Sequence, residues 1–473
     1  MAKKTKIVAT LGPATSTKEI LKELILTGVN VFRINFSHAD YEDVSERVSM
    51  IRELNKELNV NVAILADLQG PKLRVGVMQE GVVLEEGQEF AFTTEASEGD
   101  NTTAFMTYQR FPKDVKVGEQ ILVDDGKLLF EVTATDQESK VTTKVLRGGP
   151  LKSKKGVNLP NTDISLPALT EKDVEDAVFA ISLKVDWIAL SFVRNPQDLD
   201  RIHELIAKES PDYRIPVISK IEKPEAIENI DEIMLKTDGI MVARGDLGVE
   251  IPAQEVPLIQ KTLVHKAKLA RKPVIIATQM METMIENEVP TRAEVNDVAN
   301  SIMDGADAVM LSGETSVGKF PIQVIQQMRN IIESVELSEL IKVPRKAPST
   351  RNGRYITKSV CHAAAMMADN IQAKAVMTLT NSGYTAFHIS SWRPKADILA
   401  YSNNIRVCQM LNLLWGVKAF LYTNDNDTND TIEEVNKIAL DQGYIAKDDL
   451  VINLSSMPAF EKGKTNTLRV TEI

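Results

Sequence analysis

The chain of 473 residues has few of the features that cross-link proteins or anchor them in membranes. It carries two cysteines, Cys361 and Cys408, which could pair only if the fold brought them together and whose spacing matches no metal-binding motif. No run approaches the ~18 uninterrupted apolar residues of a membrane span. The basic opening stretch is not followed by the apolar segment of a secretory signal. We therefore expect a cytoplasmic protein of a reducing compartment, without membrane association.

Basic residues are outnumbered by acidic ones. The sequence has 55 Lys and Arg against 66 Asp and Glu, a net charge of −11 at pH 7. Nucleic acids and anionic membranes attract basic surfaces, so a general role at either is disfavoured. An anionic substrate would need a local pocket built by a few Lys and Arg side chains. The composition is otherwise ordinary, 43% hydrophobic and 26% charged, and can bury a substantial core.

Short β-branched or aliphatic runs, each ending in polar residues, dominate the pattern. Eight of them span residues 6–11, 31–36, 61–68, 187–192, 215–221, 239–246, 273–278 and 308–313. Such near-continuous apolar runs suit strands buried on both faces of a parallel sheet. Amphipathic segments lie between them, for example at 17–27, 44–58 and 195–208. Strands alternating with helices in this way predict an α/β (β/α)₈ TIM barrel.

The rhythm breaks after the third run. Residues 71–167 contain short alternating segments at 81–94, 119–123 and 128–145, separated by Gly and Asp turns. This pattern predicts an inserted all-β domain, which we expect to be a β-barrel that forms a lid. A capping-box pattern at Thr170 and Asp173 marks the return to helices. The catalytic barrel is therefore assigned to 1–70 and 168–340. A second α/β pattern follows a polar linker and predicts a C-terminal α/β domain at 341–473.

Polar side chains gather where the predicted barrel strands end. They are Arg33, Asn35, Ser37, Asp67, Lys220, Glu222, Arg244, Asp246, Thr278, Gln279, Ser312 and Glu314. Active sites of such barrels lie at this face. Where two of these residues are two positions apart, we expect their side chains to share one face of a strand.

Glu222 and Asp246 are hard carboxylate ligands suited to one Mg²⁺ that keeps water or substrate oxygens in its other positions. Lys220 shares a face with Glu222 and could neutralise charge on a transferring phosphoryl group. Arg33, Arg74 and Arg244 could add phosphate contacts. On residues alone, this describes a metal-dependent barrel enzyme acting on an anionic substrate.

Each of these residues also has a purely structural interpretation. Lone strand-end carboxylates are often caps or salt-bridge partners. Arg244 is better explained by a structural ion pair. Residues 154–155 have the composition of solvated surface charge, and Thr291 to Glu294 that of a helix N-terminus. Three methionines, at 280, 281 and 284, have the pattern of packing residues.

Long stretches of the chain resemble the pyruvate kinase family, in the family's order. They are TKIVATLGPAT near the start, FRINFSH at 32–38, ADLQGPKLR at 66–74, SKKGVNLP at 153–160, SLPALTEKD at 165–173, ISKIEKPEAIENI at 218–230, MVARGDLGVEIP at 241–252, ATQMMETMI at 277–285 and PTRAEVNDVANSIMDGADAVMLSGETSVGKFP at 290–321. The resemblance implies the same three-part architecture and transfer of the phosphoryl group of phosphoenolpyruvate to ADP, which gives pyruvate and ATP in the final step of glycolysis.

The resemblance also implies roles for individual residues. Lys220, Arg33 and Thr278 correspond to catalytic residues: Lys220 and Arg33 hold the phosphoryl group, and Thr278 assists protonation of the enolate. Gly245 and Asp246 correspond to substrate-binding residues, and Glu222 with Asp246 to the ligands of Mg²⁺ or Mn²⁺. Asn35, His38, Arg74, Lys154 and Lys155 correspond to residues on the nucleotide side.

One departure concerns a monovalent cation. Many family members hold K⁺ at the counterparts of Asn35, Ser37, Asp67 and Leu68, and usually carry Thr-Lys after that Asp and Glu after Gly-Pro. Here the stretch reads Asp67-Leu68-Gln69-Gly70-Pro71-Lys72, which resembles the K⁺-independent branch. The ammonium of Lys72 can supply the single positive charge. We therefore expect activity without K⁺.

The C-terminal domain resembles the family's effector-binding domain in part. Thr380, Asn381, Ser382, Gly383 and Thr385 resemble its phosphate loop, a nest of backbone N–H groups for a sugar-phosphate effector, and residues 463–467 resemble the flanking loop. Residues 454–458 depart from the glycine-rich pattern usual there. The family is commonly a homotetramer, so we expect one.

Two alternative functions predict a different sequence. A Mg²⁺-dependent aldolase or lyase acting on pyruvate or phosphoenolpyruvate would not need the inserted domain or SKKGVNLP. A non-catalytic, effector-binding relative would have lost some of the barrel's catalytic residues, yet Lys220, Glu222, Asp246 and Thr278 are all present.

Overall fold

A closed parallel barrel forms the centre of the molecule. The computed structural model describes residues 3–160, 162–338, 340–341, 343–344, 347–348, 353–424, 428–457 and 465–473, without the side chains of residues 38, 428 and 429. Within these, eight strands close in the order β1-β16-β15-β14-β13-β12-β3-β2. Their bounds are β1 Lys6–Thr10, β2 Val31–Asn35, β3 Ala63–Asp67, β12 Trp187–Leu190, β13 Val217–Ile221, β14 Gly239–Ala243, β15 Val274–Ala277 and β16 Ala308–Leu311. All eight runs predicted from the sequence are confirmed as barrel strands.

Both faces of these strands are buried, which explains their near-continuous apolar sequences. Alternate side chains such as Ile7, Phe32 and Ile64 pack against the surrounding helices, while Val8 and Leu65 belong to a second cluster that continues toward the C-terminal domain. The helices around the barrel are α1 Lys18–Thr27, α2 Tyr41–Glu57, α4 Glu171–Ser182, α5 Asp200–Glu209, α6 Pro224–Glu228, α7 Ile230–Lys236, α8 Arg244–Glu250, α9 Val256–Ala270, α10 Arg292–Met303, α11 Gly313–Ser316 and α12 Pro321–Glu336. The sequence-predicted cap at Thr170 and Asp173 is present at α4.

The inserted domain, called the lid below, is an all-β unit after β3. Its elements are β4 Val83–Leu84, β5 Glu89–Thr93, β6 Thr103–Phe105, α3 Phe111–Asp114, β7 Gln120–Val123, β8 Leu128–Thr135, β9 Lys140–Arg147, β10 Gly149–Pro150 and β11 Val157–Asn158. Six strands form one sheet in the order β11-β7-β8-β9-β5-β6, and β10 pairs with β4 separately. Phe90, Phe92 and Phe130 pack at its centre with ring centroids 5.2–5.5 Å apart.

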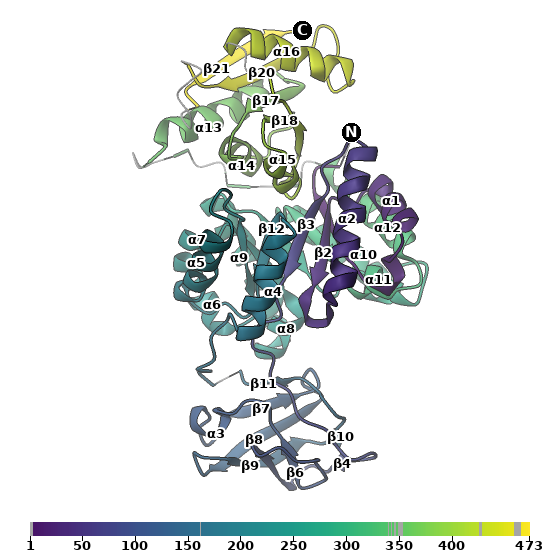
Figure 1. The fold of residues 1–473 in the computed structure, drawn as a ribbon, viewed down its shortest axis with the longest axis vertical. Coiled ribbons are helices and arrows are strands. Elements are labelled where there is room, and N and C mark those ends of the chain that lie inside the picture. Colours follow the sequence, from purple (N-terminus) through teal and green to yellow (C-terminus); the bar gives the residue numbers. More distant parts are fainter. Residues whose placement is uncertain are drawn as a thin grey trace.

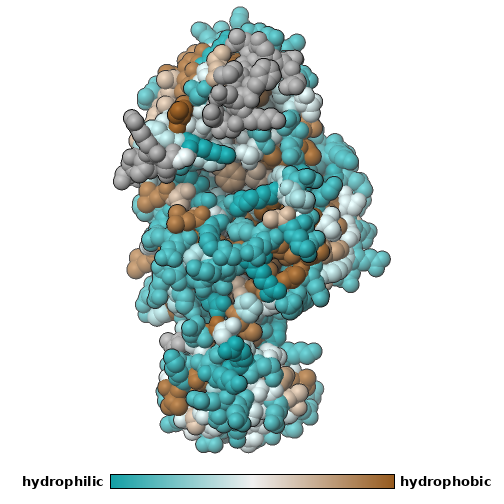
Figure 2. Space-filling model, turned by 60° about the vertical axis from the view of Figure 1, so that its left-hand side comes forward, coloured by the Kyte–Doolittle hydropathy of each residue, from teal (hydrophilic) through white to brown (hydrophobic). Residues whose placement is uncertain are grey.

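One buried carboxylate joins the two ends of the lid. Asp173 Oδ1 accepts a hydrogen bond from Gly70 N at 3.0 Å, where the chain leaves the barrel, and its Oδ2 accepts from Thr170 N at 2.9 Å, where the chain has returned. Figure 1 shows the lid at one end of the barrel and the C-terminal domain at the other. In the space-filling view a narrow neck separates the lid from the rest of the molecule (Figure 2).

The C-terminal domain is a five-stranded sheet with helices. Its elements are α13 Tyr355–Asn370, β17 Ala375–Leu379, α14 Tyr384–Ser391, β18 Asp397–Ser402, α15 Ile405–Leu411, β19 Val417–Leu421, α16 Thr428–Asp441, β20 Leu450–Ser455 and β21 Thr467–Glu472, in the sheet order β19-β18-β17-β20-β21. The pairing of β20 with β21 is antiparallel and the other pairings are parallel.

Buried polar contacts attach this domain to the N-terminal end of the barrel. Lys4 Nζ donates to the carbonyl oxygens of residues 394, 395 and 396 at 3.2, 2.6 and 3.1 Å. Lys6 Nζ donates to Val417 O at 2.7 Å. The carboxylate of Asp307, which precedes β16, pairs with Lys268 of α9 and with Arg393 of the C-terminal domain. No helix in the described part of the chain is long and apolar enough to cross a membrane.

Candidate active site

A buried ionic cluster lies where β2, β3 and β13 end. Lys220 Nζ lies 3.2 Å from Asp67 Oδ1 and 2.9 Å from Glu222 Oε1. Arg33 Nε lies 2.6 Å from Asp67 Oδ2, and its Nη1 donates to Thr10 Oγ1 at 3.0 Å. The sequence predicted these four charged residues as neighbours because parallel strands end at one face of a barrel. The structure brings them together.

The charges in this cluster favour the ionised forms of Lys220 and Asp67 but not that of Glu222. Burial alone would lower the pKa of Lys220, but the Asp67 and Glu222 carboxylates raise that pKa above its usual value. Burial tends to raise the pKa of Asp67, and the nearby Lys220 and Arg33 lower it overall. Burial raises the pKa of Glu222, and the charge of Asp246 adds to that rise. Asp246 therefore lies within electrostatic reach of both Lys220 and Glu222.

Ser191 belongs to the cluster and was missed from the sequence. Its hydroxyl accepts a hydrogen bond from Lys220 Nζ at 2.7 Å and donates to Leu68 O at 2.6 Å. Ser191 follows directly on β12, so the strand-end position that singled out the other residues would also have found it. Leu68 O is one of the atoms that the resemblance assigned to a monovalent cation.

Thr278 follows β15 in a left-handed backbone conformation, with φ of +68°, and Gln279 has φ of +52°. Such conformations strain non-glycine residues and persist where surrounding contacts enforce them. Here Arg244 Nη2 donates to Thr278 O at 2.7 Å, and Gly245 N donates to Thr278 Oγ1 at 2.7 Å. These two hydrogen bonds hold the strained Thr278 with its hydroxyl beside α8.

The predicted alternation of Arg244 and Asp246 on a strand is wrong, because β14 ends at Ala243 and α8 begins at Arg244. Arg244 Nη1 pairs with Asp297 Oδ1 at 2.7 Å, which confirms the structural ion pair. Ser37 likewise lies in a 3₁₀ turn after β2, and its N–H donates to Asn35 Oδ1 at 3.2 Å. Helical turns replace the last residues of these predicted strands.

Glu314, the Thr291–Glu294 segment and the three methionines singled out in the sequence have structural roles. Glu314 accepts hydrogen bonds from Ser312 N at 2.7 Å and Met281 N at 3.2 Å, and burial raises its pKa. Thr291 and Glu294 form a capping box at α10, as the helix N-terminus interpretation predicted. The methionines at 280, 281 and 284 are buried in the core, as expected.

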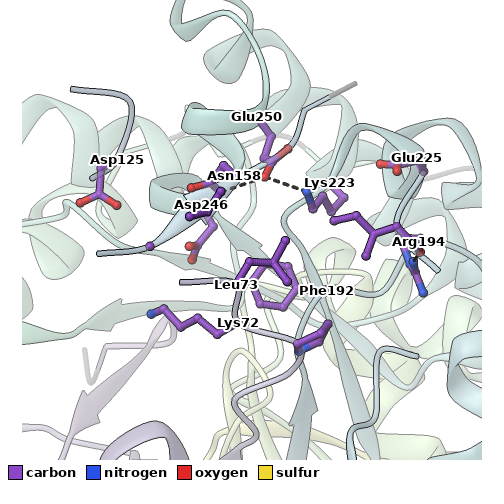
Figure 3. A pocket seen from close by; sticks show the side chains of 14 residues that line it. Lys72, Leu73, Asp125, Asn158, Phe192, Arg194, Lys223, Glu225, Asp246 and Glu250 are labelled. Carbon is purple, nitrogen blue, oxygen red and sulfur yellow. Dashed lines mark hydrogen bonds and ion pairs between the residues drawn. The ribbon is translucent and has the colours of Figure 1, made fainter. Parts of the chain in front are cut away.

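A crevice opens between the lid and the barrel beside this cluster (Figure 3). Lys72, Leu73, Asp125 and Asn158 contribute from the lid side, and Phe192, Arg194, Lys223, Glu225, Asp246 and Glu250 contribute from the barrel.

The lid residues assigned to the nucleotide lie together. Arg74 Nη1 donates to Lys154 O at 2.9 Å, and Lys155 Nζ pairs with Asp124 Oδ1 at 2.8 Å. An isolated β-bridge also joins Arg74 to Gly156. Asn35 is half-buried at the end of β2. The side chain of His38 lies outside the described part of the structure.

The donor set fits a hard divalent cation that keeps most of its ligands from water and substrate. Glu222 Oε1 is buried and forms an ion pair with Lys220, and no further hydrogen bond reaches it within the described residues. Asp246 is half-buried at the crevice. No group of three or more His, Cys, Asp or Glu side chains among the described residues could form a complete protein cage. Mg²⁺ is typically bound through one or two carboxylates plus substrate oxygens.

Comparison with known proteins agrees with this geometry. The chain matches the family model "Pyruvate kinase, barrel domain" over residues 2–325 and "Pyruvate kinase, alpha/beta domain" over residues 358–471. It is 42% identical over 471 residues to the pyruvate kinase of Corynebacterium efficiens, covering 99% of this chain and 98% of the relative. It is 41% identical over 475 residues to that of Mycobacterium tuberculosis, covering 100% and 99%.

A solved structure gives the same result. The crystal structure of a pyruvate kinase from Cryptosporidium parvum superposes with a TM-score of 0.92 at 34% identity, covering 99% of this chain and 96% of that one. Both family models lie in the order expected, and the relatives match along nearly their whole length. The chain therefore belongs to the pyruvate kinase family and is a phosphotransferase with pyruvate kinase activity.

Proposed function

We propose that the chain transfers the phosphoryl group of phosphoenolpyruvate to ADP, giving pyruvate and ATP as in the last step of glycolysis, at the cluster of Lys220, Arg33, Asp67 and Glu222. The observation that carries this proposal is the buried Lys220 ammonium, held between Asp67 and Glu222 and within electrostatic reach of Asp246. Phosphoryl transfer asks a protein mainly for positioning and charge stabilisation, and a buried, permanently charged lysine supplies both.

In this proposal Lys220 and Arg33 stabilise the transferring phosphoryl group, and Ser191 fixes the Lys220 ammonium. Mg²⁺ or Mn²⁺ held by Glu222 and Asp246 would supply a further positive charge to the substrate oxygens. The Thr278 hydroxyl, fixed beside Gly245 N, lies where it assists proton delivery to the enolate carbon. Gly245 and Asp246 bind the substrate.

The lid contributes the nucleotide side of the site. Arg74, Lys154 and Lys155 lie on adjoining segments of the lid next to the crevice. Asn35 is the last residue of β2, and His38 lies in the turn that follows it. We assign residues 71–167 as the lid that covers ADP, 1–70 and 168–340 as the catalytic barrel, and 341–473 as an effector-binding domain.

We further propose that the enzyme works without K⁺. The support is the sequence from Asp67 to Lys72 and the position of Lys72 at the crevice. Both carboxylate oxygens of Asp67 already face cations, Lys220 and Arg33. The remaining charge would come from the Lys72 ammonium when the lid closes.

The test is pyruvate formation from phosphoenolpyruvate and ADP with Mg²⁺ in a buffer free of Na⁺ and K⁺, then with K⁺ added. We expect the unmodified enzyme to be fully active without K⁺. We expect the Lys72→Glu variant to be inactive without K⁺ and to regain activity when K⁺ is added. Activity of the unmodified enzyme only with K⁺ would keep the kinase assignment and exclude the role of Lys72. No pyruvate in either buffer, with sugar phosphates also supplied, would exclude the proposed reaction.

For the C-terminal domain we propose a sugar-phosphate effector site at Thr380, Asn381, Ser382, Gly383 and Thr385. Thr380 Oγ1 accepts from Gly383 N at 2.9 Å, and Gly383 has φ of +81°, so the segment forms a tight turn before α14. Residues 463–464 of the flanking loop lie outside the described residues. Thr465 is described, and its Oγ1 lies 3.1 Å from Thr385 Oγ1. We also propose a cytoplasmic homotetramer, and the buried free thiols of Cys361 and Cys408 suit a reducing compartment.

A further inference from the structure

Three polar side chains join the lid to the barrel across the crevice; we call Asn158, Lys223 and Glu250 the clasp. Glu250 Oε1 accepts hydrogen bonds from Asn158 Nδ2 at 2.8 Å and from Lys223 Nζ at 2.8 Å. Asn158 lies on β11 of the lid, Lys223 precedes α6, and Glu250 ends α8. Figure 3 shows the two bonds converging on the Glu250 carboxylate.

The Lys223–Glu250 ion pair of the clasp is buried, and Asn158 is half-buried. Glu250 and Lys223 are each 5% exposed. Lys223 fixes the orientation of the Glu250 carboxylate, and hydrogen bonds to an ionised acceptor are stronger than those between neutral groups. Within described residues 71–160, the Asn158–Glu250 contact is the one side-chain hydrogen bond to the barrel, and farther along the lid Arg194 of the barrel donates to the carbonyl oxygens of Ile164 and Leu166. Of these contacts, the Asn158–Glu250 bond is the one that attaches a strand of the lid, β11, to the barrel.

One end of the clasp lies close to the proposed phosphoenolpyruvate-binding residues, and the other lies close to the proposed nucleotide-binding residues. Glu250 is four residues after Asp246 on α8, so the two side chains lie on the same side of that helix. Asn158 lies on β11, three residues after Lys155 in the chain. Releasing Asn158 would move the lid's nucleotide residues away from the barrel while leaving the Lys220 cluster in place.

We propose that Glu250 is a positioning residue, which docks β11 through Asn158 and thereby sets the enzyme's affinity for the nucleoside diphosphate. This inference rests on the proposed function, because it assumes that ADP binds under the lid. It predicts an effect on the Michaelis constant for ADP that is not shared by phosphoenolpyruvate, whose proposed contacts are all on the barrel.

The test exchanges the hydrogen-bond donor and acceptor between positions 158 and 250. Asn158→Asp places a second carboxylate against Glu250, and adding Glu250→Gln supplies an amide that can donate to the carboxylate introduced on β11. We expect Asn158→Asp to raise the KM for ADP by about tenfold or more, since facing like charges are strongly unfavourable, with the KM for phosphoenolpyruvate little changed. The double variant restores the KM for ADP to within about threefold of the unmodified enzyme. Asn101→Asp, the same change at an exposed lid position, is the matched control and should change neither constant.

A second readout follows the lid without turnover. Spin labels on Glu98→Cys in the lid and Lys208→Cys on α5 report the lid–barrel distance, and the two native cysteines are buried and unreactive. Asn158→Asp should broaden the distribution of label–label distances or shift it to longer values, and the double variant should restore the original distribution. An unchanged distance and an unchanged KM for ADP in Asn158→Asp would overturn the clasp. Restored distances in a protein that makes no pyruvate would retain the clasp and reject the proposed function.

Discussion

At the scale of single residues, the site depends on charges that are buried and paired at the same time. Lys220 keeps its proton because Asp67 and Glu222 outweigh the cost of burial, and Asp67 keeps its charge because Lys220 and Arg33 face its two oxygens. Removing one member of such a group leaves an uncompensated buried charge. The residues that we propose for catalysis therefore also contribute to local stability.

Replacing Lys220 tests this directly. Lys220→Met removes a cation from the proposed phosphoryl site, and we expect kcat to fall by about 10²–10³-fold or more, as for other electrostatic groups in active sites. Asp67 and Glu222 lose their partner, so we also expect the free energy of unfolding to fall by about 3–5 kcal/mol. Steady-state kinetics and urea denaturation measure the two effects. Lys22→Met, at an exposed lysine paired with Glu57, should change neither; a kcat of Lys220→Met within a few-fold of the original would contradict the assigned role.

Most members of this cluster were predictable from position alone, because each is the polar residue that ends an apolar strand. The prediction of a shared face held for Lys220 and Glu222, but not for Arg244 and Asp246. The chain enters α8 at Arg244, and a helix separates side chains two residues apart by about 200°. The backbone strain at Thr278 had no signal in the sequence, since nothing in an Ala-Thr-Gln stretch requires positive φ.

At the scale of elements, helix N-termini were the most predictable feature because their chemistry is local. The capping box at α10 has a further function, since Glu294 also ties down the preceding turn. Its carboxylate accepts from Thr283 N at 2.8 Å and Thr283 Oγ1 at 2.6 Å, besides Thr291 N at 2.8 Å. Partial burial would raise the pKa of Glu294, but these donors lower it below its usual value. In contrast, β6 was not predicted, because a strand of three residues gives too short an alternation.

The lowered pKa makes the contribution of Glu294 depend on pH. A group whose pKa is lower in the folded state stabilises the fold fully above its ordinary pKa, about 4.3 for Glu, and loses that contribution as the pH falls through the lowered value. We expect Glu294→Gln to lower the free energy of unfolding by about 1 kcal/mol at pH 7. The difference from the unmodified protein should shrink in urea titrations between pH 5 and pH 3, while the exposed neighbour Glu288→Gln should show no difference at any pH. A constant gap across that range would contradict the assigned cause.

At the scale of the whole molecule, three parts meet through a few buried polar contacts that the sequence did not reveal. The division into barrel, lid and C-terminal domain follows from changes in local pattern. The contacts that fix the parts, such as Lys4 with the carbonyls of 394–396 and Arg393 with Asp307, join residues far apart in the chain. In the sequence they are ordinary charged residues, which are usually found at the surface.

The buried Asp307 tests how strongly the C-terminal domain is held. Asp307 accepts from Val274 N at 2.8 Å and pairs with Lys268 and Arg393. We expect Asp307→Asn to leave two buried cations undercompensated and to lower the free energy of unfolding by about 3–5 kcal/mol. Lys266→Met, which breaks an exposed pair with Asp231, should cost less than about 1 kcal/mol. Equal effects of the two substitutions in calorimetry would show that the buried triad adds nothing beyond a surface pair.

The attachment of the N-terminal strand also affects how the protein is made. β1 can pair with β2 as soon as both have left the ribosome. Its other edge pairs with β16, from Lys6 to Ala308, and Lys6 Nζ donates to the carbonyl oxygen of Val417. At ~5–20 residues per second, the ~300 residues between these strands take roughly 15–60 s to synthesise. For that interval the nascent chain exposes an unpaired, apolar strand edge, which is a template for wrong pairing. Protection by chaperones therefore matters most while the chain is still being translated, before the barrel can close.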